Sequence, residues 1–388
     1  MKTILAVSIH LNLPNSMKFS FYSSLASLLF LSFSFSCSES SHTQNDVSID
    51  EKIGQMLMVG FKGFEIADTS HVVRDIQNYH TGGVILFDYD VPSGTPDRNI
   101  NSESQVIQLI DDLQQLSDTP LFIAVDQEGG QVARLKTSRG FLPTRSAEAL
   151  GEINSADTTR YYASQMAEQL QRLGFNVNFA PVVDLNTNPM NPVIGQLDRS
   201  FSDDHDVVTE HAGIFLEEFN NYNILGVLKH FPGHGSAWND SHVGMADVTD
   251  TWEEIELEPY KNLADQNENF AVMTAHVFNE NLDEDLPATL SYHVQTEILR
   301  NQVGFEGVLF SDDMQMDAIR SFYGLDTSIK NAIKAGVDVL VFANNSVYDR
   351  EIIPTSISII KELLEEGEIT EEMINESYER IMAAKERL

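Results

Sequence analysis

The segment between residues 229 and 242 holds the densest group of reactive side chains in this sequence. It reads Lys-His-Phe-Pro-Gly-His-Gly at residues 229–235 and Asp-Ser-His at residues 240–242. Ionisable groups are costly to bury unless they are paired, so one lysine, three histidines and a carboxylate within fourteen residues indicate a functional site. Imidazole and carboxylate groups of this kind can transfer protons or bind a metal ion.

Eight short apolar runs predict the strands that would position this segment. Each run is hydrophobic at both alternating positions, which is typical of parallel strands covered on both faces. Segments with helical spacing lie between them, for example Val106 to Leu116 and Val208 to Phe219. The predicted strands are residues 56–61, 83–87, 121–125, 177–183, 226–228, 271–274, 307–310 and 337–342.

The alternation of strands and helices predicts an α/β protein, a (β/α)8 TIM-like barrel in a single domain at residues 49–388. An open doubly wound sheet would need a glycine-rich phosphate turn after its first strand, and residues 56–63 do not contain one. We expect a closing amphipathic helix at residues 370–388, with Thr370 as its cap.

Polar side chains follow six of the predicted strands at their carboxyl ends. In a (β/α)8 barrel these ends meet at one mouth, where the active site forms. A single residue of this kind could be a strand-end cap, but the set predicts a polar site. Its members are Asp126, Asp184, Lys229, His230, His276, Asp312, Asp313, Asn344 and Asn345.

Three chemistries fit such a mouth. A metal site would use His230, His234, Asp240 and His242, but metal-dependent barrel hydrolases generally have a His-x-His pair after the first strand, and this sequence has none there. Phosphate chemistry would need a glycine cradle and a basic cluster. Glycoside cleavage needs a carboxylate at the anomeric carbon and an acid for the leaving oxygen, and both are available.

Six further motifs lie in order along residues 49–388. They read Val-Asp-Gln-Glu-Gly-Gly (125–130), Ala-Pro-Val-Val-Asp (180–184), Arg-Ser-Phe (199–201), Pro-Ala-Thr-Leu-Ser (287–291), Gly-Phe-Glu-Gly-Val (304–308) and Ser-Asp-Asp-Met-Gln-Met (311–316). Together with residues 229–242 they resemble glycoside hydrolase family 3, specifically its single-domain β-N-acetylglucosaminidase branch. The sequence departs from that pattern at Gln131, where arginine is common, and at residues 88–90.

The resemblance implies a retaining exo-β-N-acetylglucosaminidase that needs no cofactor and no metal, and that releases terminal GlcNAc from peptidoglycan fragments or chitooligosaccharides. Asp312 matches the nucleophile, His242 the general acid/base and Asp240 its partner. A carboxylate two residues before the histidine can orient the imidazole and support its protonated form. The implied sugar contacts are Asp126, Arg134, Arg199, Lys229 and His230.

Two other functions remain open. Some relatives transfer the sugar to phosphate, because a histidine does not repel an incoming anion as a carboxylate would, so a β-N-acetylglucosaminide phosphorylase would use the same site. A barrel that only binds surface glycans is the other alternative. For Arg134 and Arg199, an ion pair with a nearby acid competes with sugar binding.

Glycines flank the proposed acid/base pair in the sequence. Gly233, Gly235 and Gly244 predict a loop that folds over bound sugar and withdraws. On this interpretation, Gly235→Pro would damage turnover more than folding.

The charge of the chain limits its partners. Lys and Arg number 24 against 59 Asp and Glu, a formal net charge of −35. This balance disfavours nucleic acid and anionic membrane surfaces as partners. Nothing in the sequence indicates an oligomeric state.

The first 36 residues contain no acid, and an apolar run follows Met17-Lys18. They predict a signal peptide, with Met17 as a possible start. Cys37, the only cysteine, stands where a bacterial lipoprotein would be acylated; an ordinary cleaved signal is the alternative. Residues 37–48 have no apolar periodicity and predict a flexible tether. We expect an exported periplasmic or cell-surface protein that contacts the membrane through a lipid on Cys37.

Overall fold

Eight parallel strands lie at the centre of the computed structural model, which describes residues 47–266 and 269–388. They are β1 (Leu57–Gly60), β2 (Gly83–Ile85), β3 (Phe122–Val125), β6 (Val177–Asn178), β7 (Leu225–Phe231), β9 (Phe270–Thr274), β11 (Leu309–Phe310) and β12 (Leu340–Phe342). They pair in the order β11-β9-β7-β6-β3-β2-β1-β12. The ring closes where Phe310 bridges to Val339, next to β12. The predicted (β/α)8 barrel is therefore confirmed.

The barrel begins close to the start of the described chain. The predicted signal peptide, Cys37 and the tether as far as residue 46 lie outside the described residues. From Val47 onward the chain forms one compact unit. Ser48 caps helix α1 (Ile49–Gln55), because its hydroxyl accepts the N–H of Glu51 at 3.2 Å.

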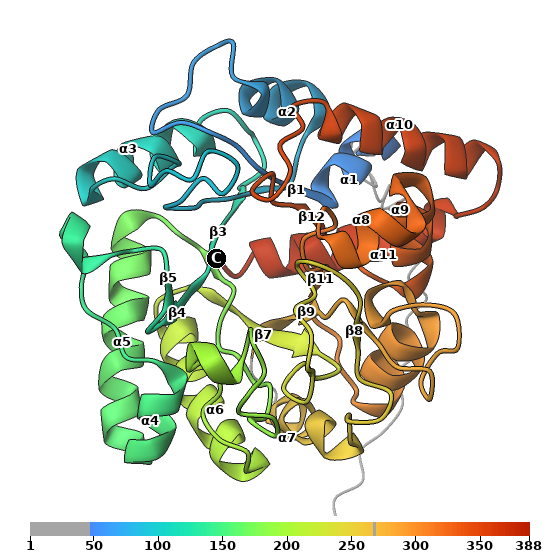
Figure 1. Ribbon diagram of the computed structural model, residues 1–388. Coiled ribbons are helices and arrows are strands. Elements are labelled where there is room, and N and C mark those ends of the chain that lie inside the picture. The colour runs from blue at the N-terminus through green and yellow to red at the C-terminus, as the bar shows by residue number, and fades with distance from the viewer. Residues whose placement is uncertain (1–46, 267–268) are drawn as a thin grey trace, which may run out of the picture. The chain divides into compact units, whose positions relative to one another are not determined.

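Helices surround the strands, as Figure 1 shows. The helical spacing predicts α3 (Glu103–Gln114) and α6 (His205–Asn221) correctly. The closing helix is α11 (Glu371–Lys385), and Thr370 caps it as predicted, accepting the N–H of Met373 at 3.3 Å. In the described ranges, no helix is long and apolar enough to cross a membrane. The other α-helices are α2 (His71–Tyr79), α4 (Ala147–Ile153), α5 (Ala156–Leu173), α7 (Glu258–Asp265), α8 (Asp317–Tyr323), α9 (Leu325–Ala335) and α10 (Ile352–Glu365).

Two strands differ most from their predicted bounds. β7 runs on to Phe231, because its pairing with β9 resumes at Thr274 after an irregularity, so Lys229 and His230 lie within the strand and not after it. The predicted strand at 177–183 is interrupted after Asn178. Pro181 has no N–H to donate to a ladder, and pairing returns only as a bridge between Val182 and Lys229.

The interior below the mouth is filled. The Phe310 ring makes edge-to-face contacts with Phe122 and Phe179, at centroid distances of 5.8 and 5.5 Å. At the amino ends of the strands, Lys385 Nζ donates to the carbonyl of Gly82 at 2.8 Å and lies 4.8 Å from the centroid of Phe122. Burial lowers the pKa of Lys385 to about 7. Helix α11 thus closes this end, and the opposite end remains available for a site.

Candidate active site

A cavity of about 250 Å³ opens at the carboxyl ends of the strands. It brings together seven of the eight residues predicted for the site, and the eighth, Asp240, contacts one of the seven. Apolar side chains such as Met273 and Val341 complete the wall. The seven residues are Asp126, Arg134, Arg199, Lys229, His230, His242 and Asp312.

A larger cavity, of about 660 Å³, lies at the other end of the barrel, between the amino ends of β9 and β11 and helix α11. Its described lining includes Arg380 and Arg387 with Glu306 and Glu379, but none of the polar residues that follow the strands. Since the chemistry of a (β/α)8 barrel lies at the carboxyl ends of its strands, the smaller cavity is the candidate site.

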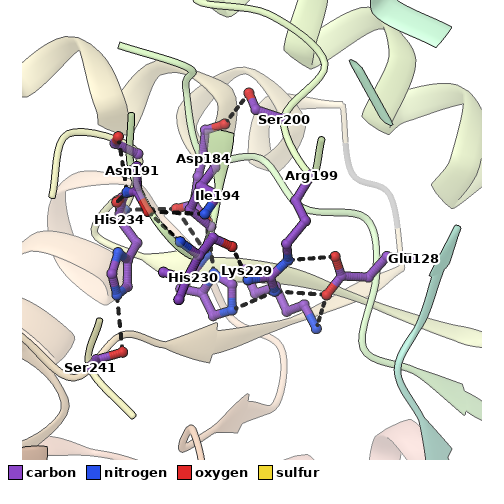
Figure 2. A network of polar contacts seen from close by, with 12 residues as sticks. Glu128, Asp184, Asn191, Ile194, Arg199, Ser200, Lys229, His230, His234 and Ser241 are labelled. Carbon is purple, nitrogen blue, oxygen red and sulfur yellow. Dashed lines mark hydrogen bonds and ion pairs between the residues drawn. The ribbon is translucent and has the colours of Figure 1, made fainter. Parts of the chain in front are cut away.

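Glu128 joins two buried cations at the cavity wall (Figure 2). It lies in β4 (Gln127–Gly129), which forms a hairpin with β5 (Val132–Ala133). Its carboxylate accepts two N–H groups of Arg199 at 2.8 Å and lies 2.8 Å from Lys229 Nζ. Burial opposes ionisation, but Arg199 and Lys229 lower the pKa of Glu128 to about 2. Glu128 is absent from the residues predicted from sequence, although its motif contains it.

Asp126 occupies the same wall and pairs with two cations. Its Oδ1 accepts from Lys229 Nζ at 2.8 Å, and its Oδ2 lies 3.3 Å from Arg134 Nη2. Burial opposes the charge, but Lys229 and Arg134 outweigh it and lower the pKa of Asp126. The two interpretations of Arg134 and Arg199 are therefore compatible, because each arginine pairs with an acid and also lines the cavity.

Asp184 orients His230 from inside the barrel (Figure 2). Its buried Oδ2 accepts from His230 Nδ1 at 2.7 Å. Burial opposes ionisation, but His230 lowers the pKa of Asp184. Nδ1 of His230 faces this carboxylate, and Arg199 Nη2 lies 3.4 Å from Nε2 on the other side of the ring. The imidazole is thus fixed with one edge toward the cavity.

Asp312 stands at the end of β11 in an ionised form. Its Oδ1 accepts the N–H of Asp313 at 2.7 Å, and its own N–H donates to Thr274 Oγ1 at 3.3 Å. Burial opposes ionisation, but the histidines around it, led by His276, and the N–H of Asp313 lower the pKa of Asp312. A carboxylate that lines a cavity and stays charged can act as a nucleophile.

Asp313 lines the cavity next to Asp312, but its carboxylate is hydrogen-bonded to backbone N–H groups. Its Oδ1 accepts from the N–H groups of Gln315 and Ala343, at 3.1 and 3.0 Å. Burial and the charge of Asp312 raise the pKa of Asp313 to about 6, although these two N–H groups oppose the rise. Asp313 therefore ties the loop after β11 to the end of β12.

His242 and Asp240 form a dyad on the loop after β7. Asp240 Oδ1 accepts from both the backbone N–H and Nδ1 of His242, each at 2.8 Å. The His242 side chain is 54% exposed and lines the cavity. Burial opposes protonation, but the hydrogen bond from Asp240 and the charge of Asp312 raise the pKa of His242. The imidazole therefore keeps its proton to a higher pH than a free imidazole does, and it can present Nε2 to a ligand.

The loop that carries the dyad is held at both ends. It leads from β7 to β8 (Ala246–Asp247), which pairs with β10 (Val277–Phe278). Near its start, the Trp252 indole N–H donates to the carbonyl of Pro232 at 3.0 Å. Motion of this loop is therefore confined to its central residues.

Two of its glycines do not act as hinges. A Cβ at Gly235 would lie 1.7 Å from the carbonyl oxygen of Leu185, and one at Gly233 would lie 2.5 Å from the Glu256 carboxylate. These glycines permit close packing, so a Cβ at residue 235 should disturb folding itself, which argues against the prediction that Gly235→Pro would damage turnover more than folding. A Cβ at Gly244 would meet no described atom within 4 Å.

Other strand-end residues face away from the cavity. His276 contacts Thr289 Oγ1 at 2.8 Å and the carbonyl of Asp313 at 3.0 Å. The Asn344 amide donates to the carbonyl of Gly60 and accepts from Gln315. These side chains fix the ends of the strands and do not line the site.

The histidines of the segment each have a different partner. His230 contacts Asp184, His234 contacts Ser241 and His242 contacts Asp240. Among the residues that the structure describes, no three His, Cys, Asp or Glu side chains are grouped so that they could hold a metal ion.

Comparisons with known proteins agree with this geometry. Residues 48–384 match the sequence profile of the glycosyl hydrolase family 3 N-terminal domain. Beta-hexosaminidase A of Pseudoalteromonas piscicida is 33% identical over 336 residues, which span 81% of this chain but only 54% of that protein. Beta-hexosaminidase LpqI of Mycobacterium tuberculosis is 30% identical over 363 residues, spanning 90% of this chain and 86% of LpqI.

A solved structure resembles the barrel closely. The family 3 β-N-acetylglucosaminidase from Paenibacillus sp. str. FPU-7 superposes with a TM-score of 0.80 and 34% identity. The match covers 88% of this chain and 62% of that one.

The substitution Glu128→Gln tests the buried ion network. It leaves Lys229 and Arg199 buried with one fewer counter-charge, so we expect the free energy of unfolding to fall by about 3 kcal/mol. Denaturant unfolding measures the change. Glu103→Gln is the matched control, because it breaks an exposed pair with Arg172 and should cost less than about 1 kcal/mol. Equal losses in the two variants would contradict this account.

Proposed function

The chain belongs to glycoside hydrolase family 3, and on that premise we propose that it is a retaining exo-β-N-acetylglucosaminidase. One observation carries the proposal: a carboxylate with a lowered pKa, Asp312, and an imidazole with a raised pKa, His242, line the same cavity. These are the two groups that double displacement at a glycosidic bond requires. The names of the relatives support an acetamido sugar as the substrate.

The reaction proceeds in two steps. Asp312 attacks the anomeric carbon while His242 gives its proton to the departing glycosidic oxygen, and a covalent glycosyl-enzyme forms. The neutral imidazole then takes a proton from water as the water attacks the same carbon. The sugar leaves with its configuration retained, and Asp312 is a free carboxylate again. Asp240 stabilises the imidazolium present before the first step and after the second.

The cavity favours a single terminal sugar. Its volume of about 250 Å³ lies below the ~300–1,000 Å³ of pockets for larger ligands. Lys229, Arg199, His230 and Asp126 supply donors and acceptors for sugar hydroxyls. A sugar that lacks one of these hydroxyls would leave a buried polar group unpaired, which penalises its binding strongly.

Terminal GlcNAc on peptidoglycan fragments or chitooligosaccharides is the proposed substrate. Such glycans lie outside the cytoplasm as well as within it, and the apolar leader that ends before Cys37 supports export with a lipid on that cysteine. The partner of the protein is then a carbohydrate, and its membrane contact is the lipid alone.

The assay that tests the function uses chromogenic β-GlcNAc beside the matching β-glucoside. We expect the wild-type protein to cleave only the GlcNAc substrate, and Asp312→Ala to lower kcat/KM more than about a thousand-fold because the nucleophile is lost. Asp317→Ala, which removes an exposed carboxylate on α8, is the control. Release of GlcNAc 1-phosphate in phosphate buffer would instead indicate a phosphorylase. Binding of GlcNAc oligomers without cleavage would indicate a glycan-binding protein.

The pH profile tests the role of the dyad. Catalysis needs Asp312 ionised and His242 protonated. Because the pKa of Asp312 is lowered from 3.8 and that of His242 is raised from 6.5, the acid limb of kcat/KM should lie below pH 3.8 and the basic limb above pH 6.5. The Asp240→Asn variant removes the carboxylate that contributes most to raising the pKa of His242. The basic limb of kcat/KM should therefore move to lower pH. Asp206→Asn, an exposed acid beside His205, is the control. An unmoved basic limb would refute the assignment of Asp240.

Cell fractionation tests the lipid anchor. We expect the full chain to sediment with membranes and Cys37→Ala to appear in the soluble fraction, because the substitution removes the acylated thiol. A Cys37→Ala protein that still sediments with membranes would exclude the anchor. The activity of the barrel should be the same in both proteins.

A further inference from the structure

The tip of the loop that carries the dyad, residues 238–243, is at least partly exposed except at one position. Trp238 is 62% exposed and Val243 75%, whereas Ser241, between Asp240 and His242, is 2% exposed. A buried polar residue in a solvent-facing segment normally has a partner, because an unpaired hydroxyl is costly to bury. The Ser241 side chain is therefore directed into the protein, whereas the other residues of the tip are at least partly exposed.

The partner of Ser241 is His234, at the base of the same loop. Its Nε2 lies 3.1 Å from Ser241 Oγ (Figure 2). His234 is itself only 2% exposed. The backbone of His234 is itself fixed on both sides. Its N–H donates to Asp184 Oδ1 at 2.8 Å, and its carbonyl accepts from the Asn191 amide at 2.7 Å. The imidazole is therefore a rigid support attached to the barrel.

The contact of Asp240 with His242 cannot take this role. It joins two residues of the tip to each other, so it orients the ring but leaves the tip free to move as a unit. Within the part of the chain that the structure describes, the Ser241 hydroxyl makes the one hydrogen bond between residues 238–243 and the barrel. The position of the dyad over the cavity thus depends on that bond.

We propose that His234 is a positioning residue, which holds the dyad of His242 and Asp240 over the sugar through the hydroxyl of Ser241. The inference rests on the proposed function, in which His242 protonates the leaving oxygen. His234 does not touch substrate; it fixes the height at which Nε2 of His242 meets the glycosidic oxygen. Burial lowers the pKa of His234 to about 4, so its ring stays neutral across the working range and the support does not titrate.

The test compares two substrates that differ in their need for an acid. 2,4-Dinitrophenolate leaves 2,4-dinitrophenyl β-GlcNAc without being protonated. Phenolate, a poorer leaving group, must be protonated as it leaves phenyl β-GlcNAc. Ser241→Ala should lower kcat/KM for the phenyl substrate roughly 5- to 10-fold, the scale of one lost hydrogen bond. It should change kcat/KM for the dinitrophenyl substrate less than about 2-fold.

Two variants separate positioning from a general structural role. Ser241→Thr keeps the hydroxyl, so kcat/KM for the phenyl substrate should be within about 2-fold of the wild-type value. Asn239→Ala truncates an exposed side chain of the same tip and should leave kcat/KM for both substrates unchanged.

A double-mutant cycle tests the pair itself. His234→Phe keeps the ring volume without Nε2, so it should reproduce the loss in Ser241→Ala, and the double variant should lose no more than either single variant. Additive losses would show that the two residues act separately and would overturn the proposal. If His234→Phe does not fold, the Ser241 variants carry the test by themselves.

The remaining outcomes are distinguishable. The positioning role would be overturned, while the proposed function stands, if Ser241→Ala lowered kcat/KM equally for both substrates. The same holds if Ser241→Ala kept full activity on the phenyl substrate. A wild-type protein that cleaves neither substrate would overturn the proposed function, and the positioning role with it.

Discussion

Burying Lys229 and Arg199 at the mouth of the barrel requires carboxylates to be buried with them, and this constraint organises the site. Glu128 joins the two cations, and Asp126 holds Lys229 from the other side. Removing either kind of charge alone would leave the other unpaired in a poorly hydrated wall. The network is therefore fixed as a whole, and its polar groups line the cavity that we propose to bind a sugar.

The two groups proposed to react, Asp312 and His242, are supported in different ways. Asp312 stands at the end of a barrel strand and is held by backbone N–H and hydroxyl groups. His242 is carried by a loop whose tip is mostly exposed. A strand end gives a fixed position, whereas a loop can admit and release a ligand. The site thus combines a rigidly held carboxylate, the proposed nucleophile, with an imidazole, the proposed acid, whose position depends on a few contacts.

Asp184 connects these two parts. It orients His230 in the polar network of the cavity wall and receives the N–H of His234, from which the loop tip is held. One buried carboxylate thereby fixes the wall of the cavity and the base of the loop that carries the dyad. Its burial is tolerated because several N–H groups stabilise its charge.

The sequence by itself determined the eight-strand barrel, the closing helix capped by Thr370 and the set of residues that could meet at the mouth. These follow from local patterns: apolar runs, helical spacing and motifs that resemble a known family. The pairing of Asp240 with His242 was also accessible, because the two residues are neighbours in the chain.

Only the tertiary structure decided which polar residues face the cavity and which face the backbone. Asp312 and Asp313 are adjacent, yet only Asp313 is tied to β12. Glu128 meets Arg199 across 71 residues, and Gly235 packs against a carbonyl that no local pattern reveals. The burial of Ser241 is of the same kind. The physical reason is that side-chain direction and long-range pairing depend on how separate strands and loops pack, and that packing is not contained in the local spacing of residues.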